Sequence, residues 1–181
     1  PNPNIVSLLA GLTPSTALDV ACGTGRHTVW LAEQGWQAHG LDFSSVGLDL
    51  ARRRAAASGV TVRLHKGDVL GGWMPENDFD LVMLSYLHYR RHGVVQVIDR
   101  MAEWVAPGGH LLVVGFDESS HPLEEGGLTL IHQLYSVELL STAMRNRGLE
   151  ISHTGVEQHR SAADNESGAL VFDTVVMARN P

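Results

Sequence analysis

Short apolar runs alternate with amphipathic segments of helical length through the first two thirds of the chain. The apolar runs predict strands over residues 17–20, 37–41, 60–65, 79–85 and 110–115. The amphipathic segments predict helices over residues 26–34, 45–58 and 93–105, the last of them ended by the Pro-Gly-Gly sequence at 107–109. This alternation is typical of repeated βαβ units, in which helices cover the faces of a buried parallel sheet.

The pattern changes after residue 115. Residues 116–136 contain acids, glycines and histidines with little periodicity, and so long an irregular insertion in a compact domain is usually functional or mobile. A further helix is predicted over residues 137–146. Strands over 150–159 and 170–178, joined by a polar turn, predict an antiparallel hairpin. We therefore expect a single α/β domain that covers residues 1–181.

Composition and charge exclude several classes of protein. A chain of 181 residues, 44% of them hydrophobic, buries enough surface to fold without a metal or a disulfide. Its single cysteine, Cys22, excludes the disulfide-rich secreted class and favours the cytoplasm. A net charge of −7 without a basic patch argues against a nucleic-acid partner. No apolar stretch approaches the roughly 20 residues that span a bilayer, so no membrane partner is expected.

Two further expectations concern metals and the start of the chain. The ten histidines show no convincing metal-ligand spacing, so we expect no metal site. Because the chain begins at Pro1 rather than at methionine, we expect that it has been processed or trimmed.

The most informative segment is 17–26, where an apolar strand carries Asp19 and leads through Gly23 and Gly25 into a helix. Glycine has no Cβ, so the backbone turns sharply there and approaches a ligand closely. A dinucleotide site prefers a third glycine where this chain has Thr28. Asp19 would also repel a pyrophosphate, at a cost of roughly 1 kcal/mol at about 4 Å in water and more when buried. The acid favours a ligand with an ammonium or sulfonium group.

Two more acids follow the next two strands. Asp42 ends the second strand, where a carboxylate accepts hydrogen bonds from both hydroxyls of a ribose. Phe43 is then expected to cover one face of an adenine ring, and Asp68 to accept a hydrogen bond from its amino group. The three acids and the glycine turn together predict a site for a positively charged nucleoside.

These segments occur together in the S-adenosylmethionine-dependent methyltransferases of class I, which the chain resembles. The matching segments, in the family's order, are Leu-Asp-Val-Ala-Cys-Gly-Thr-Gly (18–25), Gly-Leu-Asp (40–42), Gly-Asp-Val (67–69), Phe-Asp-Leu-Val (79–82) and Ala-Pro-Gly-Gly (106–109). The resemblance implies a Rossmann-like, doubly wound sheet of seven mostly parallel strands, ending in the antiparallel hairpin, with S-adenosylmethionine as cofactor. The candidate cofactor-binding residues are Asp19, Ala21, Gly23, Gly25, Asp42, Phe43, Asp68, Val69 and Ser85. Ala21 stands where the family often has glycine.

Within that family the chain is most similar to the small tellurite-resistance methyltransferases. The similarity rests on Gly-Arg-His at 25–27, Trp-Leu-Ala at 30–32 and the segment 155–160. Those relatives commonly have an upstream aromatic segment that closes over the site, which is absent here, in keeping with the expected trimming. The similarity implies that His159 and Arg160 face the methyl acceptor. An arginine there suits an anionic acceptor.

The acceptor pocket is expected beyond the fourth strand. Tyr86 and Tyr89 are candidates to shape it, and His88 is a candidate base near neutral pH.

The leading hypothesis is in-line methyl transfer to a small-molecule acceptor: a thiol, a metalloid oxyanion or another small nucleophile. Two alternatives stay open. One is a non-catalytic S-adenosylmethionine-binding sensor or assembly subunit, and the other is a nicotinamide-dependent oxidoreductase, which Asp19 and Thr28 disfavour. We expect a monomer or a homodimer.

Overall fold

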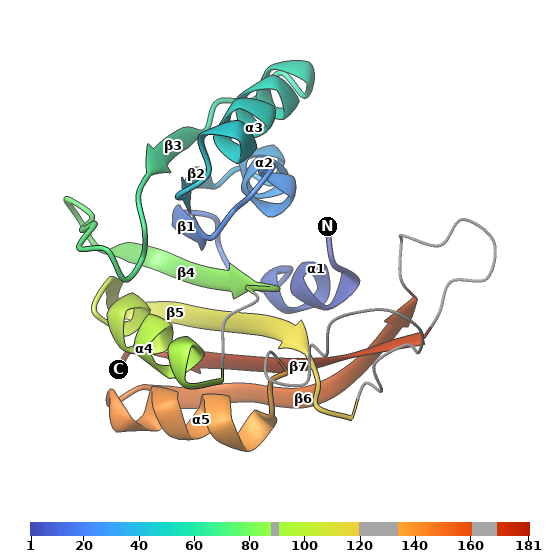
Figure 1. The fold of residues 1–181 in the computed structure, drawn as a ribbon, viewed down its shortest axis with the longest axis vertical. Coiled ribbons are helices and arrows are strands. Elements are labelled where there is room, and N and C mark those ends of the chain that lie inside the picture. The colour runs from blue at the N-terminus through green and yellow to red at the C-terminus, as the bar shows by residue number, and fades with distance from the viewer. Residues whose placement is uncertain (88–90, 120–133, 161–169) are drawn as a thin grey trace.

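A seven-stranded sheet runs through the molecule in the order β3-β2-β1-β4-β5-β7-β6 (Figure 1). The structure is a computed structural model that describes residues 1–87, 91–119, 134–160 and 170–181. The strands are β1 (Thr16–Val20), β2 (Gln37–Asp42), β3 (Arg63–Lys66), β4 (Phe79–Ser85), β5 (Val105–Phe116), β6 (Glu150–Arg160) and β7 (Leu170–Arg179). The first five run parallel, and β7 is antiparallel to both of its neighbours. The predicted α/β sheet with its reversed carboxyl-terminal hairpin is confirmed.

Helices pack on both faces of this sheet, because side chains alternate along its buried central strands. The helices are α1 (Pro3–Leu9), α2 (Arg26–Glu33), α3 (Ser45–Ala57), α4 (Arg91–Ala102) and α5 (Val137–Asn146). Val82 and Leu84 of β4 belong to the core that includes residues of α4 and α5. Leu81 and Met83 belong to the core that includes residues of α1 and α2. The two cores therefore lie on opposite faces of one strand.

Two predicted boundaries around α4 and β5 are wrong. The helix was predicted to reach residue 105 and the strand to begin at 110, but α4 ends at Ala102 and β5 already begins at Val105. The Pro-Gly-Gly sequence lies within β5, where the register with β4 shifts. There the carbonyl of Gly109 accepts a hydrogen bond from the backbone of Asn180. These residues therefore form an irregularity in a strand and not the end of a helix.

The predicted third strand is displaced, and one helix was not predicted. β3 covers Arg63–Lys66 and not 60–65, because the backbone N–H of Val60 still bonds to the carbonyl of Ala55 at the end of α3. Gly59, with φ of +67°, makes that turn. The unpredicted helix is α1, which begins with Asn2 as its cap and proline in its first turn.

The order of the strands determines where a ligand binds. The chain moves outward from β1 to β3 on one side, then crosses back so that β4 lies on the other side of β1. In open α/β sheets, ligands bind beyond the carboxyl ends of the strands at such a reversal. The turn after β1 and the residues after β4 meet there.

Candidate cofactor and acceptor site

The turn between β1 and α2 contains three residues with positive φ. They are Ala21 at +56°, Gly23 at +54° and Gly25 at +72°. A Cβ on Gly23 would meet no atom within 4 Å, so the space beside this residue is open to a ligand. A Cβ on Gly25 would lie 2.7 Å from Cβ of Ala51, so this glycine lets α2 pack against α3. Gly23 thus leaves room for a ligand, whereas Gly25 acts through packing.

Asp19 lies buried beneath this turn. Its side chain accepts a hydrogen bond of 2.7 Å from the Thr28 hydroxyl at one oxygen, and the other oxygen has no hydrogen-bond partner among the described residues. Burial raises the pKa of Asp19 to about 7, against the lowering effects of Thr28 and of Arg26. A cation above the turn would favour the ionised carboxylate and so gain from its negative charge.

Asp42 fixes the shape of the turn from the neighbouring strand. Its two carboxylate oxygens accept hydrogen bonds of 2.8 Å from the backbone N–H groups of Gly23 and Ser44. A carboxylate accepts about four hydrogen bonds, so each oxygen keeps a lone pair for a ligand hydroxyl. Asp42 therefore holds the turn and can also bind a ligand.

A cavity of about 220 Å³ lies beside this carboxylate. Its lining residues are Ala21, Leu41, Asp42, Phe43, Gly67, Asp68, Val69 and Leu87. Five of the residues predicted from the sequence to bind a cofactor are thus brought together. Phe43 is 71% exposed at the rim, available to cover a flat ligand. Asp68 accepts a hydrogen bond from the backbone of Leu70 at one oxygen.

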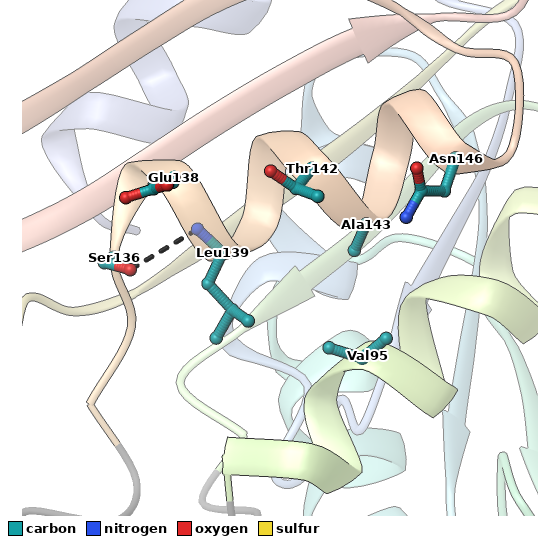
Figure 2. Close-up of a pocket in the computed structure, with 7 residues that line it drawn as sticks. All are labelled: Val95, Ser136, Glu138, Leu139, Thr142, Ala143 and Asn146. Carbon is teal, nitrogen blue, oxygen red and sulfur yellow. Dashed lines mark hydrogen bonds between the residues drawn. The ribbon is translucent and has the colours of Figure 1, made fainter.

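A larger hollow of about 320 Å³ lies between α4 and α5, as Figure 2 shows. It is lined by Val95, Ser136, Glu138, Leu139, Thr142, Ala143 and Asn146, none of which was predicted as a site residue. The smaller cavity is the better candidate for a nucleoside, because it combines two carboxylates and an aromatic ring with the glycine turn.

Past β4 the structure shows a polar cluster that joins two predicted site residues, Ser85 and Tyr86, to three that were not predicted: Asn2, His27 and Asp173. Ser85 does not line the nucleoside cavity; its hydroxyl lies 2.9 Å from Nδ1 of His27. The Tyr86 hydroxyl donates a hydrogen bond of 2.6 Å to Asp173 on β7, and Asn2 donates to both of them. Tyr86 has φ of +55°, a strained value for a tyrosine. Among the members that were not predicted, Asn2 had a local signal, because asparagine before proline is typical of the start of a helix.

Several acceptor-side predictions cannot be placed. His88 and Tyr89 lie outside the described residues. The backbones of His159 and Arg160 belong to β6, opposite Val171 and Leu170 of β7, but their side chains also lie outside the description.

Cys22, inside the glycine turn, is a buried free cysteine. Burial, together with the negative charges of Asp19 and Asp42, raises the pKa of its thiol well above the ordinary value. A thiol that stays protonated is a poor nucleophile, so Cys22 acts as a small packing residue.

Neither a metal site nor a membrane span is found in the described part of the chain. Over residues 1–87, 91–119, 134–160 and 170–181, no group of three or more histidine, cysteine, aspartate or glutamate side chains is arranged to hold a metal ion. Within the same ranges, no helix is long and apolar enough to cross a membrane.

Comparison with known families agrees with this geometry. Residues 17–109, just over half of the chain, match the family model described as a methyltransferase domain. The chain belongs to this family. It is a class I methyltransferase domain, of the kind that uses S-adenosylmethionine, and the match covers the glycine turn and all three acids of the site.

Individual relatives extend the similarity beyond that segment. A demethylmenaquinone methyltransferase from Thermus thermophilus is 31% identical over 137 residues, which make up 75% of this chain and 60% of that protein. The chain thus spans less than two thirds of this curated relative.

Solved structures show the same fold over nearly the whole methyltransferase domain. TehB from Haemophilus influenzae matches with a TM-score of 0.79 at 15% identity, covering 100% of this chain and 63% of that one. The N-methyltransferase NodS from Bradyrhizobium japonicum, in complex with S-adenosyl-L-homocysteine, matches with a TM-score of 0.73 at 20% identity, covering 98% and 83%. At these identities the likeness shows the fold alone.

Proposed function

We propose that this methyltransferase domain transfers the methyl group of S-adenosylmethionine to a small-molecule nucleophile. The observation that carries the proposal is the cavity beside the glycine turn, where Asp42, Phe43 and Asp68 meet. Open space at Gly23 gives a ligand access to the backbone of the turn. Asp42 would hold the ribose hydroxyls, and Asp68 and Phe43 would hold the adenine ring. The buried charge of Asp19 would attract the ammonium group.

When bound, S-adenosylmethionine supplies a methyl group on a positively charged sulfur. The sulfur is the leaving group and becomes a neutral thioether. The protein then contributes alignment and the exclusion of water, and approximation alone accounts for about 7 to 11 kcal/mol of rate enhancement. A base is required only where the acceptor arrives protonated. We propose His88, His159 and Arg160 for the acceptor side, with His88 as a base, and with His159 and Arg160 facing the acceptor, where the arginine suits an anionic one.

The proposal is tested by calorimetry with S-adenosylhomocysteine, followed by assays of thiol, metalloid, phenol and amine acceptors. Saturable binding and product formation with at least one acceptor are expected. Binding without any product would favour the non-catalytic sensor or assembly subunit. Equal affinity for a nicotinamide dinucleotide would favour the oxidoreductase.

Replacement of Asp42 tests the ribose assignment. Asp42→Ala removes a charged acceptor from the cavity, so the affinity for S-adenosylhomocysteine is expected to fall about tenfold or more. Because Asp42 also holds the turn, thermal unfolding of the free variant must show that it remains folded. Asp68→Ala is the matched control at the adenine end, for which a smaller loss is expected. Unchanged affinity in Asp42→Ala would exclude the residue from the ribose site.

We propose further that residues 1–181 form one domain, that the chain is a monomer or a homodimer, and that it acts in the cytoplasm. The sheet supports the first point, since its strands extend from residue 16 to residue 179. The single cysteine supports the last.

A further inference from the structure

Hydrogen bonds connect Asn2, His27 and Ser85, which are far apart in the sequence. The backbone N–H of Asn2 donates to Nε2 of His27 at 3.2 Å. On the other side of the ring, Nδ1 lies 2.9 Å from Oγ of Ser85. His27 is the second residue of α2, directly after the glycine turn, and it is buried. A single imidazole thus bridges the start of the chain and the end of β4.

The chemistry of these groups determines where each proton lies. A backbone N–H can only donate, so Nε2 must present its lone pair to Asn2. In a neutral imidazole the one proton is then on Nδ1, and Nδ1 must donate to the Ser85 hydroxyl. Burial, and next the charge of Arg26, lower the pKa of His27 to about 3, so the ring is neutral at physiological pH. The hydroxyl proton of Ser85 is left for another partner.

Asn2 is held firmly enough to impose this arrangement. Its Oδ1 accepts a hydrogen bond of 2.7 Å from the backbone of Asn4 and caps α1. Its Nδ2 donates to Asp173 at 2.8 Å and also to the Tyr86 hydroxyl. Backbone and side chain are thus both engaged, and Asn2 is only 5% exposed.

Ser85 lies at the carboxyl end of β4, beside the strand that leads into the glycine turn. It is the last residue of β4, and its neighbour Leu84 pairs with Val20, which directly precedes the glycine turn. Ligands of open α/β sheets bind beyond these strand ends. Ser85 is partly exposed there, and its hydroxyl and the buried carboxyl of Asp19 both contact side chains of α2, those of His27 and Thr28.

We propose that Asn2 and His27 form a relay that fixes the Ser85 hydroxyl as a hydrogen-bond donor to the methyl acceptor. This inference rests on the proposed function and specifies its substrate class. A fixed hydroxyl that donates a hydrogen bond orients a substrate atom with a lone pair. Such atoms are the oxygen of a phenol or enol and the sulfur of a thiol. The fixed hydroxyl disfavours a protonated amine, which presents only N–H groups. Ser85 is the residue that touches the acceptor, and His27 and Asn2 are positioning residues.

The relay is tested directly by ¹⁵N NMR of the His27 ring, which distinguishes the two neutral tautomers without any substrate. The wild-type protein is expected to show a protonated Nδ1 and an unprotonated Nε2 at pH 7. Asn2→Pro removes the backbone N–H, and φ of −68° at this position suits proline. Asn2→Ala is the matched control, because it lacks the same side chain but keeps the N–H.

Asn2→Pro is expected to shift the population toward protonated Nε2, and Asn2→Ala to shift it much less. Equal spectra in the two variants, or a wild-type ring protonated on Nε2, would overturn the relay. Thermal unfolding of both variants shows that the comparison is made on folded protein.

The role of Ser85 is tested by methyl transfer to catechol, as an oxygen probe, and to benzylamine, as an amine probe. The wild-type protein is expected to methylate catechol faster. Ser85→Ala should lower the rate of catechol methylation at least tenfold, while its affinity for S-adenosylhomocysteine stays within twofold of wild type. Ser85→Thr should restore the rate. Preference for benzylamine, or an unchanged rate in Ser85→Ala, contradicts the assignment. Cofactor binding without methylation of either probe counts against the oxygen acceptor assigned to Ser85, whereas failure with the whole panel of thiol, metalloid, phenol and amine acceptors counts against the proposed function. The His27 spectrum decides the relay separately.

Discussion

Asp19 carries a carboxyl group into the interior of the molecule, and this makes the free protein sensitive to pH. Burial raises its pKa from 3.8 to about 7, so the folded state keeps a proton that the unfolded state loses above pH 4. Stability from this residue is therefore fully present below pH 4 and is lost as pH rises toward 7. The loss reaches about 1.4 kcal/mol per pH unit at most.

Asp19→Asn removes that titration. The free energy of unfolding of the variant, relative to wild type, is expected to rise between pH 4 and pH 7 and then to level off. Urea unfolding of both proteins across this range measures the difference, in which the contributions of other titrating groups cancel. Parallel profiles for the two proteins would show that Asp19 is not the buried titrating group.

Residue identities were predictable at this site, but the partners of those residues were not. The sequence pointed to Asp42 as a ligand-binding acid, whereas its bond to the backbone of Gly23 depends on how β2 lies beside β1. Asp173 was missed because a lone acid in an apolar strand has no local pattern. Its contact with Asn2 spans 171 positions and is set by the fold alone.

At the scale of elements, packing decided the boundaries that local patterns left uncertain. The Pro-Gly-Gly sequence is a strong local signal for the end of a helix, yet it lies in β5 because the strand pairs on both sides of it. The strands β1, β2 and β4 were predicted nearly to the residue, since their apolar runs are buried on both faces. α1 has only seven residues, too few for a periodic pattern.

The contact between α2 and α3 gives a test at this scale. Gly25 and Gly59 both have positive φ, of +72° and +67°, but only Gly25 faces Ala51 on α3. Gly59→Ala is expected to cost about 1 kcal/mol of stability, from backbone strain alone. Gly25→Ala is expected to cost a further 1 to 3 kcal/mol or so, because the two helices must move apart. Thermal or urea unfolding measures both, and equal losses would mean that the helices are not tightly packed at this point.

At the scale of the whole molecule, topology explains why the site is where it is. The turn after β1 and the hydroxyl of Ser85 after β4 belong to segments about 60 residues apart in the chain, yet the strands that carry them are neighbours in the sheet. The class I fold and the glycine turn were predictable together because their segments occur in a fixed order. The polar cluster past β4 joins Asn2, at the start of α1, to Asp173 on β7, and no sequence pattern connected these two ends of the chain.

Cofactor binding should couple this whole arrangement to the proton on Asp19. The ammonium group of the cofactor favours the ionised carboxylate, so binding below pH 7 must release a proton. The affinity for S-adenosylhomocysteine is therefore expected to fall as pH drops from 8 to 5, by up to about tenfold per unit below pH 7. Calorimetry at each pH measures it. Asp19→Asn is the control, since it keeps the cofactor's own titration but lacks the carboxylate; its affinity should be weaker at pH 8 and should vary less. If both proteins lose affinity in parallel, Asp19 does not sense the ligand's charge.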